Sequence, residues 1–354
     1  QKHLCQLVRG LAERGHRAVV FCLNPIVAPS YRAALSAAGA ELHLTGKARV
    51  VSGIALPEMA AVVRRERAAL IVTVLFAGTL AGRAVALLTG LPVITCVQAR
   101  NVNYRRWQFA LLRATAARTA CFVFNSRAAI PFAVAREGAA AEKCRHVANG
   151  VEVPPVPRAK PVRPRAWGAA ADETVIGAIG RLDPQKGFDV LLQAFALLRR
   201  QGRAVRLILI GGGGEEARLK RRARELSVEP HVHFTGEDPA AAELLPGLDL
   251  YVQPSRFEGT PNAVMEAMAA GVPVVASRVD GLVELIEPGR TGWLAEPADA
   301  ASLAAAMERA LADPARAAAV AASGRDEMER KFPVRDMVAA YETIFVEFLG
   351  AVKS

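Results

Sequence analysis

Closely spaced cysteines are missing from this 354-residue chain. Its cysteines are odd in number and form no CxxC pair: Cys5, Cys22, Cys96, Cys121 and Cys144. Disulfide frameworks and zinc sites need paired or clustered cysteines, and most of these five stand in apolar runs instead. The pattern favours buried free thiols in a reducing compartment, with no metal site.

Long hydrophobic runs and internal repeats are also missing. The longest uncharged apolar segment, residues 68–82, lies between Arg67 and Arg83. It is shorter than the roughly 20 residues of a membrane-spanning helix, so a strand followed by a helix start explains it better. There is no repeat of solenoid period and no basic platform interleaved with aromatic residues, so nucleic acid is not an expected partner.

What is present is the composition of a folded globular protein with an uneven charge. The chain is 52% hydrophobic and 22% charged, and its length predicts two domains. Residues 1–160 hold 22 Lys and Arg against 7 Asp and Glu, whereas residues 161–354 hold 23 against 27. Two explanations stay open: an anionic partner for the first half, such as a membrane surface or an acidic acceptor, or an Arg-rich genome.

The order of elements predicts an α/β fold of two Rossmann-like parallel-sheet domains. Short β-rich runs alternate with amphipathic helices in both halves, and a proline-rich stretch separates them. In the first half the pattern predicts strands at 17–23, 69–75, 92–97 and 120–124 and helices at 4–14, 57–66, 79–89 and 104–117. In the second half the predicted elements include strands at 174–179 and 205–210 and helices at 188–200 and 262–270. Such domains bind ligands beyond the carboxyl ends of their strands, and two of them in series are expected to face each other across a cleft. The predicted parts are an N-terminal domain (1–152), a linker (153–168), a C-terminal domain (169–332), and a last helix (333–354) returning to the N-terminal domain.

The most informative segment is residues 257–271, in which Glu258 and Glu266 stand eight residues apart at a loop-to-helix junction. We expect Thr260 to cap this helix, Pro261 to occupy its first turn and Gly271 to end it. Free amides and the helix dipole favour a phosphate at the helix start. With a carboxylate on either side to bind hydroxyl groups, the segment suits a nucleotide sugar.

A second segment, residues 180–187, follows a predicted strand and precedes a predicted helix. Its sequence, GRLDPQKG, carries Arg181 and Lys186 on a loop at the carboxyl end of that strand. Both cations could converge on a diphosphate, the arginine as a fork and the lysine as a point charge. A basic pair in a loop is often only solvated surface, but this one shares a sheet edge with the Glu258–Glu266 segment.

Taken together, these motifs resemble the retaining glycosyltransferases of family-4 type, which have the GT-B architecture. The resemblance extends over nearly the whole chain and includes Pro254-Ser255 before Glu258-Gly259 and the run from Glu266 to Val274. The turns at 124–126 and 149–151 support it in the first half. A single motif of this kind is weak evidence, but their order and spacing together are specific.

The resemblance implies roles for named residues. Arg181 and Lys186 would hold the donor diphosphate, and Glu258 would contact the donor sugar near its reacting face; these three are the expected catalytic residues. Glu266 would bind the ribose hydroxyls. Further donor contacts are expected from Gly180, Glu237, Gly259, Thr260 and Asn262. The resemblance implies retention by front-side attack, with a UDP- or GDP-linked hexose or N-acetylhexosamine as donor and with neither cofactor nor metal.

The acceptor side is less defined. Relatives often carry a histidine after the strand predicted at 92–97, where this chain has Gln98, Ala99, Arg100 and Asn101. Arg100 and Asn101 are candidates to position an acceptor, which we expect to be a glycan or a lipid-linked molecule. The resemblance implies a role in cell-envelope polysaccharide synthesis, in the cytoplasm or at the inner face of its membrane.

The start of the chain departs from the family pattern. Relatives open with a strand and a glycine-rich loop, whereas this sequence begins at a predicted helix, so we expect the first sheet to lack a central strand. Two alternatives to a transferase stay open. One is a GT-B nucleotide-sugar epimerase, which would not need a basic acceptor domain, and the other is a catalytically inert GT-B scaffold, which the missing strand favours.

Overall fold

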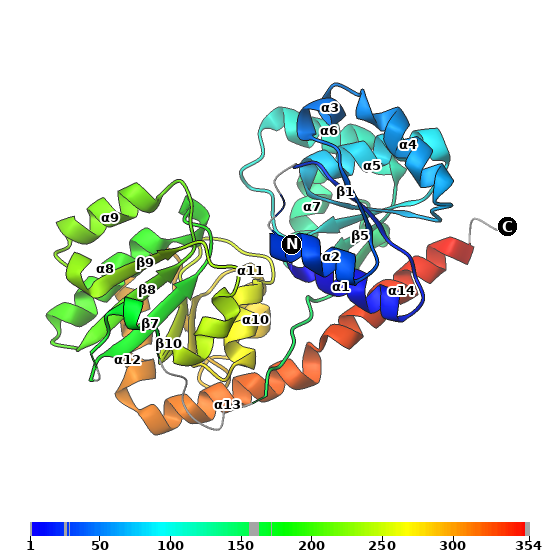
Figure 1. The fold of residues 1–354 in the computed structure, drawn as a ribbon. Coiled ribbons are helices and arrows are strands. Elements are labelled where there is room, and N and C mark those ends of the chain that lie inside the picture. Colours follow the sequence, from blue (N-terminus) through cyan, green and yellow to red (C-terminus); the bar gives the residue numbers. More distant parts are fainter. Residues whose placement is uncertain (1, 25–26, 28, 156–162, 171, 351–354) are drawn as a thin grey trace. The chain divides into compact units, whose positions relative to one another are not determined.

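The chain folds into two compact α/β units, each with its own core (Figure 1). The structure, a computed structural model, describes residues 2–24, 27, 29–155, 163–170 and 172–350. Unit 1 combines Gln1–Gly150 with Val334–Ser354, and unit 2 is Val151–Pro333. Residues 156–162 of the predicted linker lie outside the described part.

Unit 2 contains one six-stranded parallel sheet in the order β12-β11-β10-β7-β8-β9. Its strands are β7 (Thr174–Ile179), β8 (Val205–Ile210), β9 (Val232–Gly236), β10 (Leu250–Gln253), β11 (Val274–Ser277) and β12 (Trp293–Ala295). Its helices are α8 (Phe188–Arg200), α9 (Glu216–Glu225), α10 (Asn262–Ala269), α11 (Asp280–Leu285), α12 (Ala300–Ala312) and α13 (Pro314–Lys331).

Both faces of this sheet are buried, and alternate residues of each strand point to opposite faces. On β8, Leu207 and Leu209 belong to the core under α8 and α12, while Ile208 and Ile210 belong to the core under α10 and α11. A parallel sheet covered on both sides requires such continuous apolar strands, which explains why β7 and β8 are almost free of charge.

Unit 1 contains two parallel sheets, with strand orders β1-β2 and β3-β4-β5-β6. The strands are β1 (Val19–Cys22), β2 (Glu41–Leu44), β3 (Ile71–Val74), β4 (Val93–Val97), β5 (Thr119–Phe124) and β6 (Cys144–His146). The helices are α1 (Lys2–Glu13), α2 (Pro29–Ala37), α3 (Lys47–Val51), α4 (Ala55–Arg65), α5 (Leu75–Thr89), α6 (Arg106–Thr115), α7 (Ala129–Glu137) and α14 (Val334–Gly350). No hydrogen bond of a described strand joins the two sheets, so the strands of unit 1 form no continuous sheet.

Helix α14 packs in unit 1 although it comes last in the sequence. Tyr341 and Val338 are buried against Ile94 and Val123 of the four-stranded sheet, in a cluster that also includes Leu7 of α1. The Tyr341 ring lies 5.7 Å from that of His3. The last helix is therefore part of the unit 1 core.

A buried cation connects α5 to the elements beside it. Arg83 is 2% exposed, and its guanidinium donates to Thr119 Oγ1 (2.9 Å), Thr115 Oγ1 (2.8 Å) and the Leu112 carbonyl (3.0 Å). Burial is the main reason that its pKa falls to about 10. These neutral acceptors satisfy the charge and fix α5 against α6 and β5.

The strongest sequence patterns predicted their elements closely. Strands at 174–179 and 205–210 and the helix at 188–200 have the predicted bounds. Short elements in the first half were missed: α2, β2, α3, α7 and β6. They lack a long amphipathic period, and α2 buries only Leu35, so tertiary contacts decide them.

All five cysteines are free thiols, of which Cys96 and Cys121 are buried and the other three partly buried. Burial raises the pKa of Cys96 to about 12 and that of Cys121 to about 11, which leaves both thiols protonated and unreactive. Within the described ranges, every helix is too short or too polar to cross a bilayer.

Gly150 gives a test of how α14 is held. A Cβ there would lie 2.6 Å from Val334 Cα and 3.3 Å from Met337 Cβ, whereas Gly78 on α5 has open space. Gly150→Ala should destabilise unit 1 by about 1–3 kcal/mol through overpacking. The control Gly78→Ala should be neutral or stabilising by about 0.5–1 kcal/mol, because helix interiors favour alanine. Urea denaturation followed by circular dichroism measures both, and equal stability of the two variants would contradict this packing.

Candidate functional site

The candidate site lies at the carboxyl ends of the strands in unit 2, where the strand order reverses. From β7 the chain continues to β8 and β9 on one side, and it returns to β10 beside β7 before reaching β11 and β12. The loops after β7 and β10 therefore lead away in opposite directions. Between such loops lies a crevice, where open α/β sheets bind ligands. The loops that follow β7 (180–187) and β10 (254–261) are the two predicted site segments.

These loops are packed backbone to backbone. Gly187 has φ +67°, and a Cβ there would lie 2.1 Å from the Pro254 carbonyl oxygen. Gln185 adds two contacts: its side chain donates to the Phe257 carbonyl (3.1 Å), and its own carbonyl accepts from the Arg256 amide (2.8 Å). Only glycine allows so close an approach, so the sequence at 187 fixes the spacing of the two loops.

A largely buried ion pair joins the loops. Lys186 Nζ donates to Glu258 Oε1 at 2.5 Å, and the two side chains are only 17% and 7% exposed. Breaking a buried pair leaves an uncompensated charge, so each partner strongly fixes the position of the other. The structure thus brings together two of the three predicted catalytic residues.

Polar residues of β10 and of the loop after it extend this pair into a chain of hydrogen bonds. Ser255 Oγ donates to the same Glu258 Oε1 (2.8 Å), and Gln253 Nε2 donates to Ser255 Oγ (2.7 Å) and to Glu258 Oε1 (3.4 Å). The Tyr251 hydroxyl donates to Gln253 Oε1 (2.6 Å). Since all donors from the described residues reach Oε1, the second carboxylate oxygen of Glu258 keeps its acceptor capacity for a ligand.

Burial, together with the nearby charges of Glu266 and Glu258, raises the pKa of the Tyr251 hydroxyl well above its usual range. The hydroxyl therefore stays protonated and acts as a hydrogen-bond donor. Because the charges of both carboxylates raise this pKa, Glu266 and Glu258 both lie near the Tyr251 hydroxyl.

Helix α10 carries Glu266 and begins at Asn262 as predicted, but its cap differs from the prediction. Its N-cap is Pro261, whose carbonyl accepts the amides of Val264 (3.2 Å) and Met265 (3.3 Å), and no side chain caps the helix. The prediction that Thr260 caps the helix was wrong, because the extended Pro261 supplies the first acceptor itself. Gly271, with φ +71°, follows the last helical residues as predicted.

The accessible side of α10 carries the polar residues. Asn262 and Glu266 are partly exposed and four residues apart, so they lie on one face of the helix, while Val264 and Met265 are fully buried. Gly259 and Thr260 are buried in the preceding loop, and a Cβ at Gly281 would lie 2.1 Å from the Gly259 carbonyl oxygen. The loop before α10 is thereby pressed against the start of α11.

Arg181 shares the loop with Lys186 but is oriented differently. Its side chain is 76% exposed and pairs with Asp183 (2.8 Å), and no contact among the described residues joins it to the Lys186–Glu258 pair. Gly180 is packed under Lys186, with a Cβ position 3.4 Å from that side chain. Glu237, after β9, lies beside Gly212 in the loop after β8, where a Cβ would be 2.8 Å from Glu237 Cγ.

The predicted acceptor-side residues belong to unit 1, in the loop after β4. Asn101 Nδ2 donates to Glu137 Oε1 (2.8 Å), and Glu137 is only 5% exposed. Burial raises the pKa of the Glu137 carboxyl, against the hydrogen bond from Asn101 and the charge of Arg83. Arg100, next to Asn101, is partly buried.

Sequence reasoning missed several residues that hold the site. Tyr251, Gln253 and Ser255 stand at every second position, and this period of two could have indicated a shared polar face on a strand end. Arg256 binds Asp189 of α8 with two hydrogen bonds of 2.9 and 2.8 Å, which anchor the loop after β10. A pair 67 residues apart carries no local signal.

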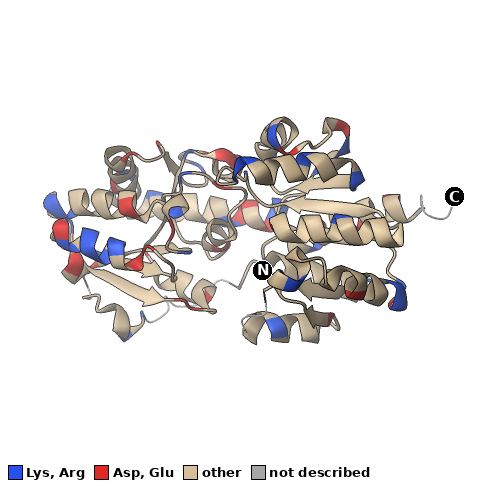
Figure 2. Cartoon of the chain, turned by 90° about the horizontal axis from the view of Figure 1, so that it is seen from above, with Lys and Arg blue, Asp and Glu red and all other residues tan. Residues whose placement is uncertain are grey.

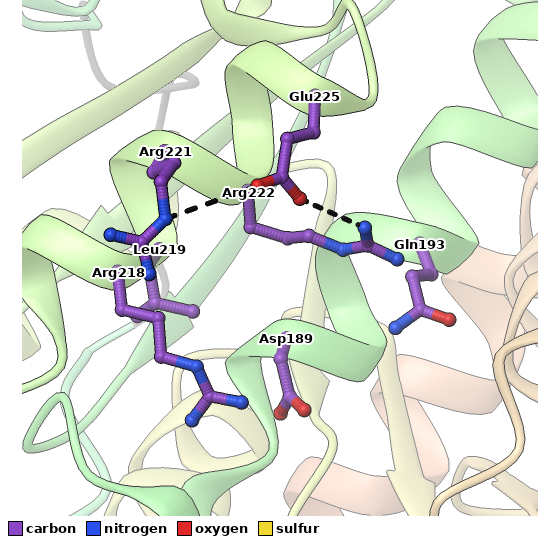
Figure 3. A pocket seen from close by; sticks show the side chains of 7 residues that line it. All are labelled: Asp189, Gln193, Arg218, Leu219, Arg221, Arg222 and Glu225. Atoms are coloured by element: carbon purple, nitrogen blue, oxygen red, sulfur yellow. Dashed lines mark hydrogen bonds and ion pairs between the residues drawn. The ribbon is translucent and has the colours of Figure 1, made fainter.

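A separate hollow of about 340 Å³ lies between α8 and α9 (Figure 3). Its lining includes Arg218, Arg221 and Arg222, and acidic neighbours neutralise them: Glu215 binds Arg218 (2.6 Å), and Glu225 binds Arg221 (3.9 Å) and Arg222 (3.0 Å). These pairs mark an ordinary solvated helix surface. Among the described residues, no group of three or more His, Cys, Asp or Glu could hold a metal ion.

Comparison with known families assigns both halves of the chain. Residues 1–153 match the model of Glycosyltransferase Family 4, and residues 160–327 match that of Glycosyl transferases group 1. The chain belongs to the family-4 type glycosyltransferases of GT-B architecture. Anabaena HepE, solved with UDP and glucose, shares this fold with a TM-score of 0.82 at 20% identity, over 98% of this chain and 95% of that protein.

Curated relatives match about half of the chain. A GDP-mannose-dependent alpha-(1-6)-phosphatidylinositol monomannoside mannosyltransferase of Mycolicibacterium smegmatis is 37% identical over 51% of this chain and 50% of its own. The amylovoran biosynthesis glycosyltransferase AmsK of Erwinia amylovora is 36% identical over 44% and 40%. The chain thus spans about half the length of these relatives, or less.

Ser255 offers a test of the hydrogen-bond chain. Ser255→Ala should lower the unfolding free energy of unit 2 by about 1–3 kcal/mol, because it leaves buried polar partners unsatisfied. Ser323→Ala on α13 should change it by less than about 0.5 kcal/mol. The buried Trp167 and Trp293 both lie in unit 2 and report its urea unfolding. A stability loss no larger than that of the control would contradict the network.

The buried Glu137 should make the stability of unit 1 depend on pH. Because its pKa is raised in the folded state, its ionisation costs stability as pH rises above the ordinary value of 4.5. Glu137→Gln should therefore stabilise unit 1 at pH 7–8, and the gain should vanish toward pH 4. Thermal unfolding across this range, with the exposed Glu142→Gln as control, measures it. A gain in stability that does not depend on pH would contradict the raised pKa of the Glu137 carboxyl.

Proposed function

We propose that this chain is a retaining glycosyltransferase that transfers a hexose or N-acetylhexosamine from a nucleotide diphosphate sugar. The observation that carries the proposal is the Lys186–Glu258 pair at the point of strand reversal, in a chain of this family. With both groups held together there, the lysine can bind the diphosphate and the glutamate can bind the sugar. The names of relatives support UDP- or GDP-linked donors, since one is GDP-mannose-dependent and another was solved with UDP.

Lys186 is the group that would act on the leaving diphosphate. Its ammonium has three donors, of which Glu258 Oε1 uses one, so it can bind a phosphate oxygen without leaving the carboxylate. Negative charge on that oxygen grows as the glycosidic bond breaks, so the lysine stabilises the transition state more than the bound donor. Arg181 would join it after exchanging Asp183 for the phosphate.

Glu258 and Glu266 would have different tasks. The Oε2 atom of Glu258 would accept a hydroxyl of the donor sugar, since Gln253 and Ser255 already hold Oε1. Glu266 and Asn262, on the accessible face of α10, would bind the ribose, and the amides near Gly259 and Thr260 would add to phosphate binding. Gly180 and Glu237 would border the nucleotide. Fixed cations and amides would take the place of a metal ion or cofactor.

In a retaining reaction of this kind, neither carboxylate needs to attack the sugar. The acceptor hydroxyl would approach the face that the diphosphate leaves, and a phosphate oxygen would take its proton. We propose a glycan or lipid-linked acceptor, with Arg100 and Asn101 of unit 1 on the acceptor side. The reaction would belong to cell-envelope polysaccharide synthesis, on the cytoplasmic side of the membrane.

Lys186→Gln and Glu266→Gln test the donor site. Each should lower donor turnover by at least about 100-fold, as for loss of one preorganised donor or acceptor. Lys220→Gln on α9, which removes an ion pair with Glu216 and a contact over the Phe234 ring, should leave turnover unchanged. Turnover is measured as nucleotide release from UDP-, GDP- and ADP-sugars, with and without membranes, and circular dichroism checks the fold.

The same assay separates the alternatives. Release that depends on an acceptor supports the transferase, whereas an epimerised donor sugar would indicate an epimerase. Absence of both nucleotide binding and turnover would indicate an inert scaffold. Normal turnover in either the Lys186 or the Glu266 variant would overturn the assignment of these residues.

A further inference from the structure

The stretch from residue 67 to residue 136 has an unusual charge. It contains no Asp, Glu or Lys but nine arginines: Arg67, Arg83, Arg100, Arg105, Arg106, Arg113, Arg118, Arg127 and Arg136. Of these, Arg83 is buried in the core. The surface formed by this stretch is therefore cationic without local carboxylates, and unit 1 as a whole holds 22 Lys and Arg against 9 Asp and Glu. Figure 2 colours the basic and acidic residues along the ribbon.

Helix α6, in the middle of this stretch, is apolar on its outer side as well as its inner side. Phe109 and Leu112 are buried in unit 1, as expected for an amphipathic helix. On the outer side, however, Trp107 is 53% exposed and Leu111 is 42% exposed. They are four residues apart and thus adjacent on one face of the helix. A large exposed tryptophan beside an exposed leucine is typical of a surface that meets a partner.

The arginines around these two residues are available for contacts. Arg105 and Arg106 make no ion pair with any described residue, and Arg113 donates only to the Ala135 carbonyl (3.2 Å). The arginines of α9 differ in this respect. Arg221 and Arg222 both pair with Glu225 (Figure 3), and Arg218 pairs with Glu215. We call the surface of Arg105, Arg106, Trp107, Leu111 and Arg113 the α6 face.

The Trp107 ring packs against aromatic side chains of unit 1. It packs edge-on against Phe76 of α5 with ring centroids 5.6 Å apart, and Phe76 packs against Tyr104 at 5.5 Å. The aromatic ring is thus presented on a rigid support, so little conformational entropy is lost when a partner covers it.

We propose that the α6 face docks onto a membrane surface that contains anionic lipids. Tryptophan and leucine side chains favour the boundary between headgroups and acyl chains, and arginines that flank them attract lipid phosphates. A second copy of the chain fits less well, because a symmetric contact would bring arginine against arginine without a carboxylate. The inference rests on the proposed function, in which a lipid-linked acceptor is reached at a membrane, and it names the surface that makes the contact.

Vesicle binding by the whole chain tests this docking without any sugar substrate. Vesicles of phosphatidylcholine with about 30% phosphatidylglycerol should sediment with the protein, and vesicles of phosphatidylcholine alone should bind it at least tenfold more weakly. Trp167 and Trp293 are 2% and 5% exposed, so a blue shift of tryptophan emission on binding reports Trp107.

Two double variants and two controls locate the contact. R105Q/R106Q and, separately, W107S/L111S should each lower the affinity for anionic vesicles at least tenfold. R221Q/R222Q on α9 and the exposed Val283→Ser on α11 should bind as the parent chain does. If W107S/L111S fails to fold by circular dichroism, R105Q/R106Q decides the outcome alone.

Several results would overturn the docking. These are no binding of the parent chain to anionic vesicles, equal binding by the α6 and α9 double variants, or a dimer in solution that W107S/L111S dissociates. Binding to RNA with equal affinity and the same dependence on Arg105 and Arg106 would also overturn it. Nucleotide binding without vesicles separately tests the proposed function, so failure of one does not imply failure of the other.

Discussion

The ion pair between Lys186 and Glu258 is the contact on which the candidate site depends. The two residues are 72 positions apart in sequence, yet they follow neighbouring strands of one sheet, and the pair fixes the distance between the two loops. Nearly every other feature of the site supports this pair. Gly187 lets the loops approach, Arg256 anchors one loop to α8, and the polar chain from Tyr251 through Ser255 holds Glu258 by one oxygen.

Holding a carboxylate by one oxygen has a chemical consequence. A buried Glu258 with both oxygens paired would be a structural residue, whereas one with a remaining acceptor can still bind a substrate hydroxyl. The same holds for Lys186, whose ammonium has donors left after it binds Glu258. The desolvation of both groups is offset within the protein, and the pair keeps donors and an acceptor for a ligand.

The two units differ in how far their basic side chains are paired with acids. In unit 2, cations are paired with acids both at the site and on the surface of α9. In unit 1, arginines of residues 67–136 have no acids within that stretch of sequence, and α6 adds exposed apolar side chains to them. The sequence suggested an anionic partner or a genomic bias for these arginines. The arginines beside Trp107 and Leu111 have no ion pair within the described part of the chain. They favour a partner, since a bias in composition would not place apolar residues among them.

The sequence by itself determined the α/β class and the bounds of β7, β8 and α8, and it singled out Glu258, Glu266 and Lys186 as candidates, because these depend on local periodicity and on short motifs. It did not determine the polar chain from Tyr251 to Glu258, the anchoring of Arg256 by Asp189, or the exposure of Arg181 away from the pair. Each of these depends on contacts between segments far apart in sequence. A carboxylate in a motif has no fixed partner until the sheet places a lysine beside it, and an exposed tryptophan looks like a core residue until its helix is packed.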